Sequence, residues 1–486
     1  GQLPRARPRR HAAGVPRGHL PAGSDNKFIA GFDPEQVALD GYTSQSMTQW
    51  GTSLRLDYHI EGTGTLYSVT AFEKAKVEST GDIDGANCYA FIPGCTLGTI
   101  NVGAFPSNTG GITRPEEFSQ ELRFASEDMN GVRLQGGVYY FSQKLSYHEY
   151  NYFQGTGNRA ADHDQDIFHD NRNENYGVFA SGEFSASDQL TLRAGVRYSH
   201  DRRHDKVSGF GPFLFGYMLP VQARVTGSAV TWDASATYAV TPEINLYARF
   251  ATGYQGPAIQ DRVNFGSRQT TAPKQTTISG EGGIKGALAG GVNFALDAYW
   301  YRTSDLQITA VGGSSNSASL ISADKAIGYG LEAEFEARPV PQLALTAGAS
   351  YNFTEIRDPT ISVGVCANCT VLDPLVAGRA VINGNDLPQA PRWVANWTAR
   401  YSIPLGDGGE IDALTDWAYR SSINYFLYDS KEFRGRSLLE GGLKIAYKSA
   451  GGWEVGAFAR NITNQIRSIS GIDFNNLTGM INDPRI

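Results

Sequence analysis

Long apolar runs are missing from this 486-residue sequence: it contains no 18 consecutive apolar residues, which excludes a transmembrane helix. Charged residues amount to only 19%, and the net charge of −7 gives no reason to expect a nucleic-acid partner. The sequence also lacks a nucleophile elbow, a glycine-rich phosphate loop and a zinc-protease helix. We therefore expect no enzyme, no catalytic residue, no cofactor and no resident metal.

The first 51 residues show no strand pattern, and we assign them to an irregular N-terminal segment. Residues 1–23 (GQLPRARPRRHAAGVPRGHLPAG) have the Arg, Pro, Ala and Gly bias of a GC-rich reading frame translated out of register, which is a hypothesis about their origin. The basic run inside them, PRARPRR, is typical of a disordered tail. The first twenty residues contain no signal-peptide stretch, so we expect any export signal to lie upstream of Gly1.

Cysteine is scarce, with four residues in two close pairs, Cys88 with Cys95 and Cys366 with Cys369. An even number at short spacing favours two local disulfides in an oxidising compartment, although spacing alone does not fix the connectivity. A zinc or redox role for Cys366 and Cys369 is the alternative. Zinc requires two further ligands, and a redox pair usually stands at a helix start beside a βαβ pattern, which is absent from this sequence.

What the sequence has in abundance is alternation of apolar and polar residues with a period of two. In LTLRAGVRY (190–198) and LEAEFEAR (331–338) every second residue is apolar, whereas a helix would scatter the charges around its axis. Most such segments exceed the five or six residues usual for soluble strands, and suit the roughly 9–11 needed to cross a bilayer. The sixteen segments lie near 52–60, 63–77, 115–126, 132–143, 174–185, 189–200, 229–238, 244–253, 276–286, 291–303, 327–338, 342–353, 390–402, 409–420, 436–448 and 452–463.

The connections between these segments alternate between short and long. In an antiparallel meander, alternate connections lie at opposite ends, so one end has tight turns and the other has long loops. This sorting is typical of an outer-membrane barrel, with turns in the periplasm and loops outside the cell. We therefore predict an all-β fold: a transmembrane antiparallel β-barrel whose apolar face meets lipid and whose polar face lines the lumen. The long gaps are 78–114, 144–173, 201–228, 254–275, 304–326, 354–389 and 421–435.

Four motifs in order resemble those of TonB-dependent outer-membrane receptors. EEFSQELRFAS (116–126) resembles their SQE-hydrophobic-R strand, and LYARFATGYQGPAI (246–259) resembles their YARY-x-x-GYK-x-P strand and loop. GYGLEAEFEARP (328–339) resembles the strand-pair signature that follows. GGWEVGAFARNITNQ (451–465) resembles their near-terminal strand. The resemblance covers residues 52 to the end, and we assign 52–486 to the receptor barrel.

The resemblance implies a barrel of 22 strands, of which about 16 are visible, plugged by an N-terminal domain. It implies an outer-membrane receptor that binds a scarce extracellular ligand, a ferric siderophore first and an oligosaccharide next. Import would draw energy from the TonB complex through the plug. We expect the plug, the TonB box and the last strand to lie outside this chain, so the barrel portion would be C-terminally incomplete. A passive porin-like channel and a non-functional barrel fragment are the alternatives.

Two polar stretches are candidates for ligand contact. HDQDIFHD (163–170) combines His163, Asp164 and His169 with further carboxylates, a mixture able to hold a transition metal or a ferric complex, although a solvated loop is the simpler interpretation. HDRRHDK (200–206) includes Arg202 and Arg203, which suit an anionic group, or merely a solvated loop base.

The remaining candidates lie in loops around the predicted strand at 244–253. FGPFLFGYML (210–219), which contains Tyr217, is apolar for a loop and suits either packing or a ligand wall. Tyr254, Gln260 and Arg262 follow the strand directly, where the chain would leave the membrane. Exposed tyrosines suit sugars and aryl siderophores equally, so the sequence does not identify the ligand.

Overall fold

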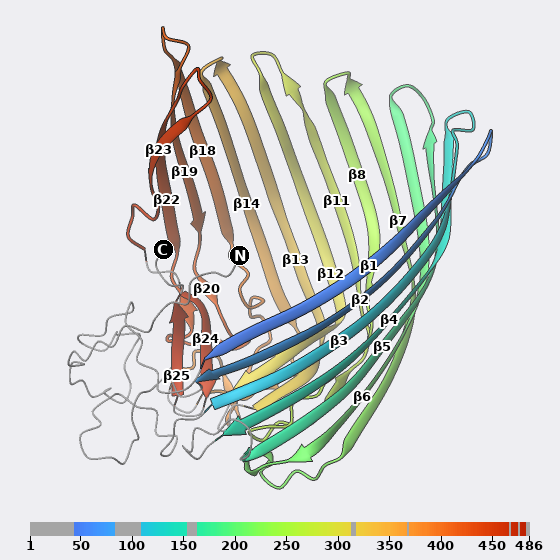
Figure 1. The fold of residues 1–486 in the computed structure, drawn as a ribbon, viewed down its shortest axis with the longest axis vertical. Coiled ribbons are helices and arrows are strands. Elements are labelled where there is room, and N and C mark those ends of the chain that lie inside the picture. Colours follow the sequence, from blue (N-terminus) through green and yellow to red (C-terminus); the bar gives the residue numbers. More distant parts are fainter. Residues whose placement is uncertain are drawn as a thin grey trace.

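The computed structural model describes residues 43–82, 108–152, 163–312, 317–366, 369–465, 468–474 and 477–482. Most of them form one antiparallel sheet of sixteen strands, in which each strand pairs with its neighbour along the chain. The sheet curls around a central axis (Figure 1). Its strands are β1 (Ser44–Ile60), β2 (Gly64–Asp82), β3 (Asn108–Ser126), β4 (Val132–Tyr152), β5 (Gln165–Ser185), β6 (Leu190–Phe210), β7 (Val221–Thr241), β8 (Ile244–Gln255), β11 (Gln275–Leu288), β12 (Val292–Gly312), β13 (Ser317–Val340), β14 (Leu343–Arg357), β18 (Trp393–Pro404), β19 (Glu410–Arg420), β22 (Leu438–Lys448) and β23 (Glu454–Ala459).

Each of the sixteen strands overlaps one of the sixteen segments predicted from alternation, and the all-β antiparallel architecture is confirmed. β1 begins at Ser44, inside the stretch 1–51 that we expected to be irregular. Tight turns join the hairpins along one rim, at the top of Figure 1, and the long connections lie at the opposite rim. We call these the turn rim and the loop rim. Glycines with positive φ occur in several tight turns, for example Gly62 and Gly290, at angles that side chains with a Cβ rarely adopt.

The two faces of the sheet differ in chemistry, as the period of two predicts. Val178, Tyr198 and Val230 are paired across β5, β6 and β7, and all three are exposed large hydrophobic residues on the outward face. Beyond Tyr198 the same face of β6 carries His200, Arg202, His204 and Lys206 instead. The apolar band therefore ends near Tyr198, and the ends of β5 and β6 at the loop rim lie outside the membrane.

The strands on the loop-rim side are longer than predicted. Alternation indicates starts at 174 and 327, whereas β5 begins at Gln165 and β13 at Ser317. Much of several expected long loops is therefore strand. The cause is physical: backbone pairing continues beyond the band, but both faces there meet water or other loops, so the apolar period disappears while the ladder of hydrogen bonds persists.

Helices contribute little to the described part of the chain. The short 3₁₀ helix η1 (Pro212–Leu214) follows β6. Within the described residues, no helix is long and apolar enough to cross a membrane.

At the loop rim, the connections that follow β14 and β19 fold together around a buried core. Tyr428 and Phe433 are each 1% exposed and pack with Ile356 and Ile382. Cys366 belongs to the same core and forms a disulfide with Cys369, with Cα atoms 5.7 Å apart. The predicted pair Cys88 and Cys95 lies outside the described residues.

Short strands outside the main sheet lie in the connections that follow β8, β14 and β19 and in the segment after β23, and they pair only with one another. They form one three-stranded sheet and three two-stranded sheets. The strands are β9 (Ala258–Gln260), β10 (Thr270–Ala272), β15 (Ser362–Val363), β16 (Leu375–Val376), β17 (Arg379–Val381), β20 (Ile423–Asn424), β21 (Arg434–Gly435), β24 (Ser468–Phe474) and β25 (Leu477–Asn482).

Candidate functional site

The connection between β8 and β11, residues 256–274, folds back onto the inner face of the wall formed by β4, β5 and β6. We call it the inner loop. Its Val263 packs against Ile167 and Val207, which are fully buried on the inner face of β5 and β6. The Nε2 amide of Gln165 donates a hydrogen bond of 2.8 Å to Oδ1 of the buried Asn264. Apolar and polar contacts together hold this loop on the wall.

Three titratable side chains meet where the inner loop touches the wall: His169 from β5, Asp205 from β6 and Asp261 from the loop. We call them the inner cluster. Nδ1 of His169 lies 3.0 Å from Oδ2 of Asp261, and Nδ2 of Asn171 donates to the same oxygen at 3.0 Å. Asp205 accepts a hydrogen bond from Nε2 of Gln269, also in the inner loop. One nitrogen or oxygen atom from each cluster member lies within 4.8 Å of the other two.

Two of the three members of the inner cluster are buried, and burial shifts the pKa values of its carboxylates. His169 is 4% exposed and Asp205 is 2% exposed. Burial raises the pKa of Asp205 to about 6, and the nearby carboxylate of Asp261 adds to the rise. Burial also pushes the pKa of Asp261 upward, but the hydrogen bonds from His169 and Asn171 outweigh it, and the net shift is downward. At neutral pH, both carboxylates are therefore mostly ionised, that of Asp205 in a buried position and that of Asp261 with its side chain 33% exposed.

The stretch HDQDIFHD does not act as one group, because β5 sends alternate side chains to opposite faces. Asp166 turns outward, where its Oδ1 lies 2.6 Å from Nε2 of His148 and 2.7 Å from Nδ1 of His163. We call these three residues the outer cluster. The His148 ring stacks on Phe168 with centroids 4.3 Å apart.

The stretch contains two further carboxylates, Asp164 and Asp170. The backbone N–H of Asp164 donates to the carbonyl oxygen of Asn151 at 3.0 Å. Asp170 lines a shallow cavity of about 320 Å³ on the outward face, together with Arg114, His148 and Lys206.

Several of the predicted contact residues gather on or beside the inner loop. The guanidinium of Arg262 lies 5.5 Å from the centre of the Phe265 ring, and burial lowers the pKa of Arg262. Nε2 of Gln260 donates to the carbonyl oxygens of Arg268 and Ala318, at 3.0 Å in each case. Arg268 in turn lies over the Tyr217 ring at 5.3 Å.

The remaining predicted residues lie on the long strands. Arg202 is on the outward face of β6, where its Nε donates to Nε2 of His200 at 3.1 Å. Arg203 is paired with Asn173 and, by the alternation of β6, belongs to the inner face. Tyr254 stands next to the inner loop at the end of β8. The structure thus separates Arg202 from Arg203 and gathers Tyr217, Gln260 and Arg262.

Three residues of the two clusters were not identified from the sequence. His148 lies on β4 and His163 lies just before β5, and no local spacing links the two. Asp205 stands inside the basic stretch HDRRHDK, and Asp261 stands between Gln260 and Arg262. A signal was present for the two aspartates, since both adjoin singled-out residues, but it is the register of β5 with β6 that places Asp205 near His169, and the folding of the inner loop that adds Asp261.

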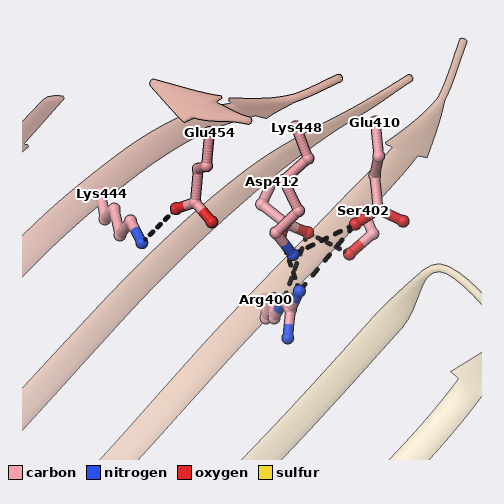
Figure 2. Close-up of polar contacts among 7 residues, drawn as sticks. All are labelled: Arg400, Ser402, Glu410, Asp412, Lys444, Lys448 and Glu454. Carbon is pink, nitrogen blue, oxygen red and sulfur yellow. Dashed lines mark hydrogen bonds and ion pairs between the residues drawn. The ribbon is translucent and has the colours of Figure 1, made fainter. Parts of the chain in front are cut away.

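A second polar centre lies on the inner face at the turn rim, across β18, β19 and β22 (Figure 2). Asp412 is 7% exposed and accepts hydrogen bonds from Arg400, whose Nη2 lies 2.7 Å away, and from Ser402. Lys448 forms an ion pair with the same carboxylate and lies 3.5 Å from Glu410. We call Arg400, Ser402, Glu410, Asp412 and Lys448 the turn-rim network.

Comparison with known proteins identifies the architecture. Residues 7–462 match the family model described as TonB dependent receptor-like, beta-barrel. The ferric yersiniabactin uptake receptor FyuA from Yersinia pestis is similar in structure, with a TM-score of 0.71 and 14% identity over 92% of this chain and 61% of that one. No curated protein sequence matches this chain.

Two further solved structures show the same fold. The siderophore receptor PiuA from Acinetobacter baumannii has a TM-score of 0.65 and 14% identity, covering 91% of this chain and 64% of that one. The ferric-catecholate import receptor Fiu from E. coli K12, in its closed form, has a TM-score of 0.63 and 13% identity, covering 89% and 62%. This chain therefore spans less than two thirds of the length of each receptor.

Proposed function

The chain belongs to the TonB-dependent receptor β-barrel family, and from that premise we propose that it captures a ferric siderophore outside the cell for import. Members of the family are outer-membrane proteins of Gram-negative bacteria, and this chain is an outer-membrane protein. The siderophore, the coupling to TonB and the action of a plug domain inside the barrel are parts of the proposal. An oligosaccharide is the second candidate ligand.

The observation that carries the proposal is the cationic and aromatic surface around the inner loop. Arg262 and Arg268 lie over aromatic rings, and Tyr217 and Gln260 adjoin them. Guanidinium groups bind carboxylates and phenolates through charge-assisted hydrogen bonds, and aromatic rings contact flat aryl groups. Ferric siderophores combine both chemistries. The proposal also agrees with the printed descriptions of the similar receptors, which name ferric yersiniabactin, siderophores and ferric catecholates.

Uptake of radioactive iron in cells tests this proposal. A strain that lacks the gene would be compared with one that carries it, using ferric catecholate, ferric hydroxamate and ferric citrate under iron limitation. We expect gene-dependent, saturable uptake of at least one complex, and its loss when the proton gradient is collapsed. Uptake that persists without the gradient would instead indicate a passive channel. Gene-dependent uptake of an oligosaccharide without iron uptake would establish the second candidate.

Substitution of Arg262 localises the binding. Arg262→Gln removes a cation at the loop rim, and we expect the apparent Kd for the imported complex to rise about tenfold or more, since charge-assisted hydrogen bonds contribute about 1.5–3 kcal/mol. Arg338→Gln is the matched control, because Arg338 ends β13 near the turn rim and is well exposed. Equal effects of the two substitutions would contradict a site at the inner loop.

A further inference from the structure

We propose that the inner cluster of His169, Asp205 and Asp261 binds a divalent transition-metal ion that fastens the inner loop to the wall of β5 and β6. The ion is a resident part of the receptor in this proposal, separate from the imported ligand. The inference does not depend on which ligand the receptor imports.

The geometry supplies three ligand atoms from three separate parts of the chain. His169 and Asp205 are anchored on neighbouring strands, and Asp261 comes from the inner loop, 92 residues after His169. One potential ligand atom from each lies within 4.8 Å of the others. Ligand atoms about 2.0–2.1 Å from a tetrahedral zinc ion are about 3.3 Å apart, so atoms that lie within 4.8 Å of one another need to approach by at most about 1.5 Å, and Nδ1 of His169 is already 3.0 Å from Oδ2 of Asp261. Rotation of the side chains suffices for such a shift.

The second observation is that two buried polar atoms of the inner cluster lack a hydrogen-bond partner. Nε2 of His169 and Oδ1 of Asp205 are buried, and neither has a hydrogen-bond partner in the described part of the chain. A buried polar atom without a partner costs about 1–3 kcal/mol, and native proteins leave few of them. Both atoms are metal-ligand types. A metal ion bound by these two atoms would satisfy both of them.

Charge is the third observation. The inner cluster brings the carboxylates of Asp205 and Asp261 together, and among their described side-chain hydrogen-bond donors, His169, Asn171 and Gln269, only His169 can carry a positive charge. Neighbouring carboxylates repel one another, the more so where one of them is buried as Asp205 is, unless opposite charge compensates for them. A divalent cation balances the two carboxylates.

The ligand set selects the class of metal. Imidazole nitrogen suits zinc, copper, iron and nickel, whereas calcium and magnesium prefer oxygen alone. One imidazole with two carboxylates therefore favours a first-row transition ion such as Zn²⁺ over Ca²⁺. Three protein ligands leave at least one position for water.

Trypsin cleavage of the inner loop provides the test, because Arg262 and Arg268 offer cleavage points within it. The full-length receptor would be purified from outer membranes in detergent, stripped with a chelator, and digested with and without added Zn²⁺ or Ca²⁺. Cleavage after each arginine would be followed by mass spectrometry. We expect Zn²⁺ to slow cleavage after Arg268 at least tenfold, and Ca²⁺ to leave it unchanged.

Variants assign the effect to the inner cluster. His169→Gln and Asp205→Asn should each abolish the protection by Zn²⁺. His163→Gln, which disrupts the outer cluster, is the matched control and should retain it. The shift in gel mobility between heated and unheated samples would show that each variant is folded, and Co²⁺ absorption in the visible range would report ligation independently of cleavage.

Three results would overturn the proposal. One is protection by Zn²⁺ that survives in folded His169→Gln, and another is protection that disappears in His163→Gln. The third is equal protection by Ca²⁺, which would contradict the assignment to a transition metal. A failure to import iron would not affect these outcomes, so this proposal and the proposed function can fail separately.

Discussion

Asp412 is the shared acceptor of the turn-rim network, and Asp412→Ala measures how strongly side chains hold β18, β19 and β22 together (Figure 2). The substitution leaves Arg400 and Lys448 without their nearest counter-charge and removes the acceptor of the Ser402 hydroxyl. Hydrogen bonds to charged groups contribute about 1.5–3 kcal/mol each, and three donors are affected. The loss should be smaller than the sum of the three contributions. The side chains of Arg400 and Lys448 are 47% and 39% exposed, so water can solvate them, and Glu410 remains nearby as a counter-charge.

We therefore expect Asp412→Ala to lower the free energy of unfolding by about 2–3 kcal/mol. Asp412→Asn keeps an acceptor but removes the charge, and should lie between the alanine variant and the wild type. Glu454→Ala is the matched control: Glu454 forms an ion pair of 2.9 Å with Lys444, but both side chains are more than 40% exposed. Water screens such a pair, so its loss should be hard to detect.

Urea unfolding in lipid vesicles, followed by tryptophan emission and by the gel-mobility shift, measures these differences. Trp417 lies on β19 and Trp397 on β18, so two reporters stand on strands of the network. If Asp412→Ala and Glu454→Ala destabilise the barrel equally, burial is not what makes Asp412 important. A change below about 1 kcal/mol for Asp412→Ala would likewise contradict the reasoning.

Three further predictions concern the loop rim and the sheet. Burial and the nearby Asp373 raise the pKa of Asp429, so the native state binds more protons at this carboxyl than the unfolded chain does. The stability of the loop core should therefore fall as the pH rises through the raised pKa. Hydrogen exchange measured from pH 4 to 7 should show this loss of stability, and Asp429→Asn should make stability less dependent on pH. Phe433→Ala should cost about 3–5 kcal/mol within the loop core alone, seen as faster exchange there while urea unfolding of the barrel is unchanged. Gly441→Ala places a Cβ 2.5 Å from Cε3 of the Trp417 ring, and should cost about 1–3 kcal/mol in urea unfolding; an unchanged midpoint would show that the ring moves aside freely.

Alternation was sufficient to predict where the sheet strands lie, because lipid and lumen impose opposite chemistry on adjacent residues. Val196 and Arg197 on β6 illustrate the rule: one is an exposed apolar residue on the outward face, and the other turns inward and donates to Ser199. Alternation no longer predicts strands beyond the membrane. Residues 165–173 of β5 and 317–326 of β13 pair as regularly as the rest, but neither face needs to be apolar there, so the sequence carries no period.

The candidate site was predicted only in part, since its members are brought together by register and by loop folding. Tyr217, Gln260 and Arg262 were singled out individually, but their association depends on how the inner loop folds back over the wall. The contact between His169 and Asp261 spans 92 residues, and no spacing rule connects them. Local patterns therefore indicate residue type and face, whereas the partner of each side chain requires the three-dimensional structure.

The 21-residue strands β5 and β6 set how far the wall beneath the inner loop extends beyond the apolar band. At about 3.3 Å per residue and a tilt near 40°, such a strand rises roughly 50 Å along the barrel axis. The apolar band of an outer-membrane barrel is about 25 Å tall, which leaves a collar of roughly 25 Å standing clear of the hydrocarbon. The inner loop packs on β5 and β6 within this collar, so the proposed contact between Arg262 and a ligand would form clear of the hydrocarbon.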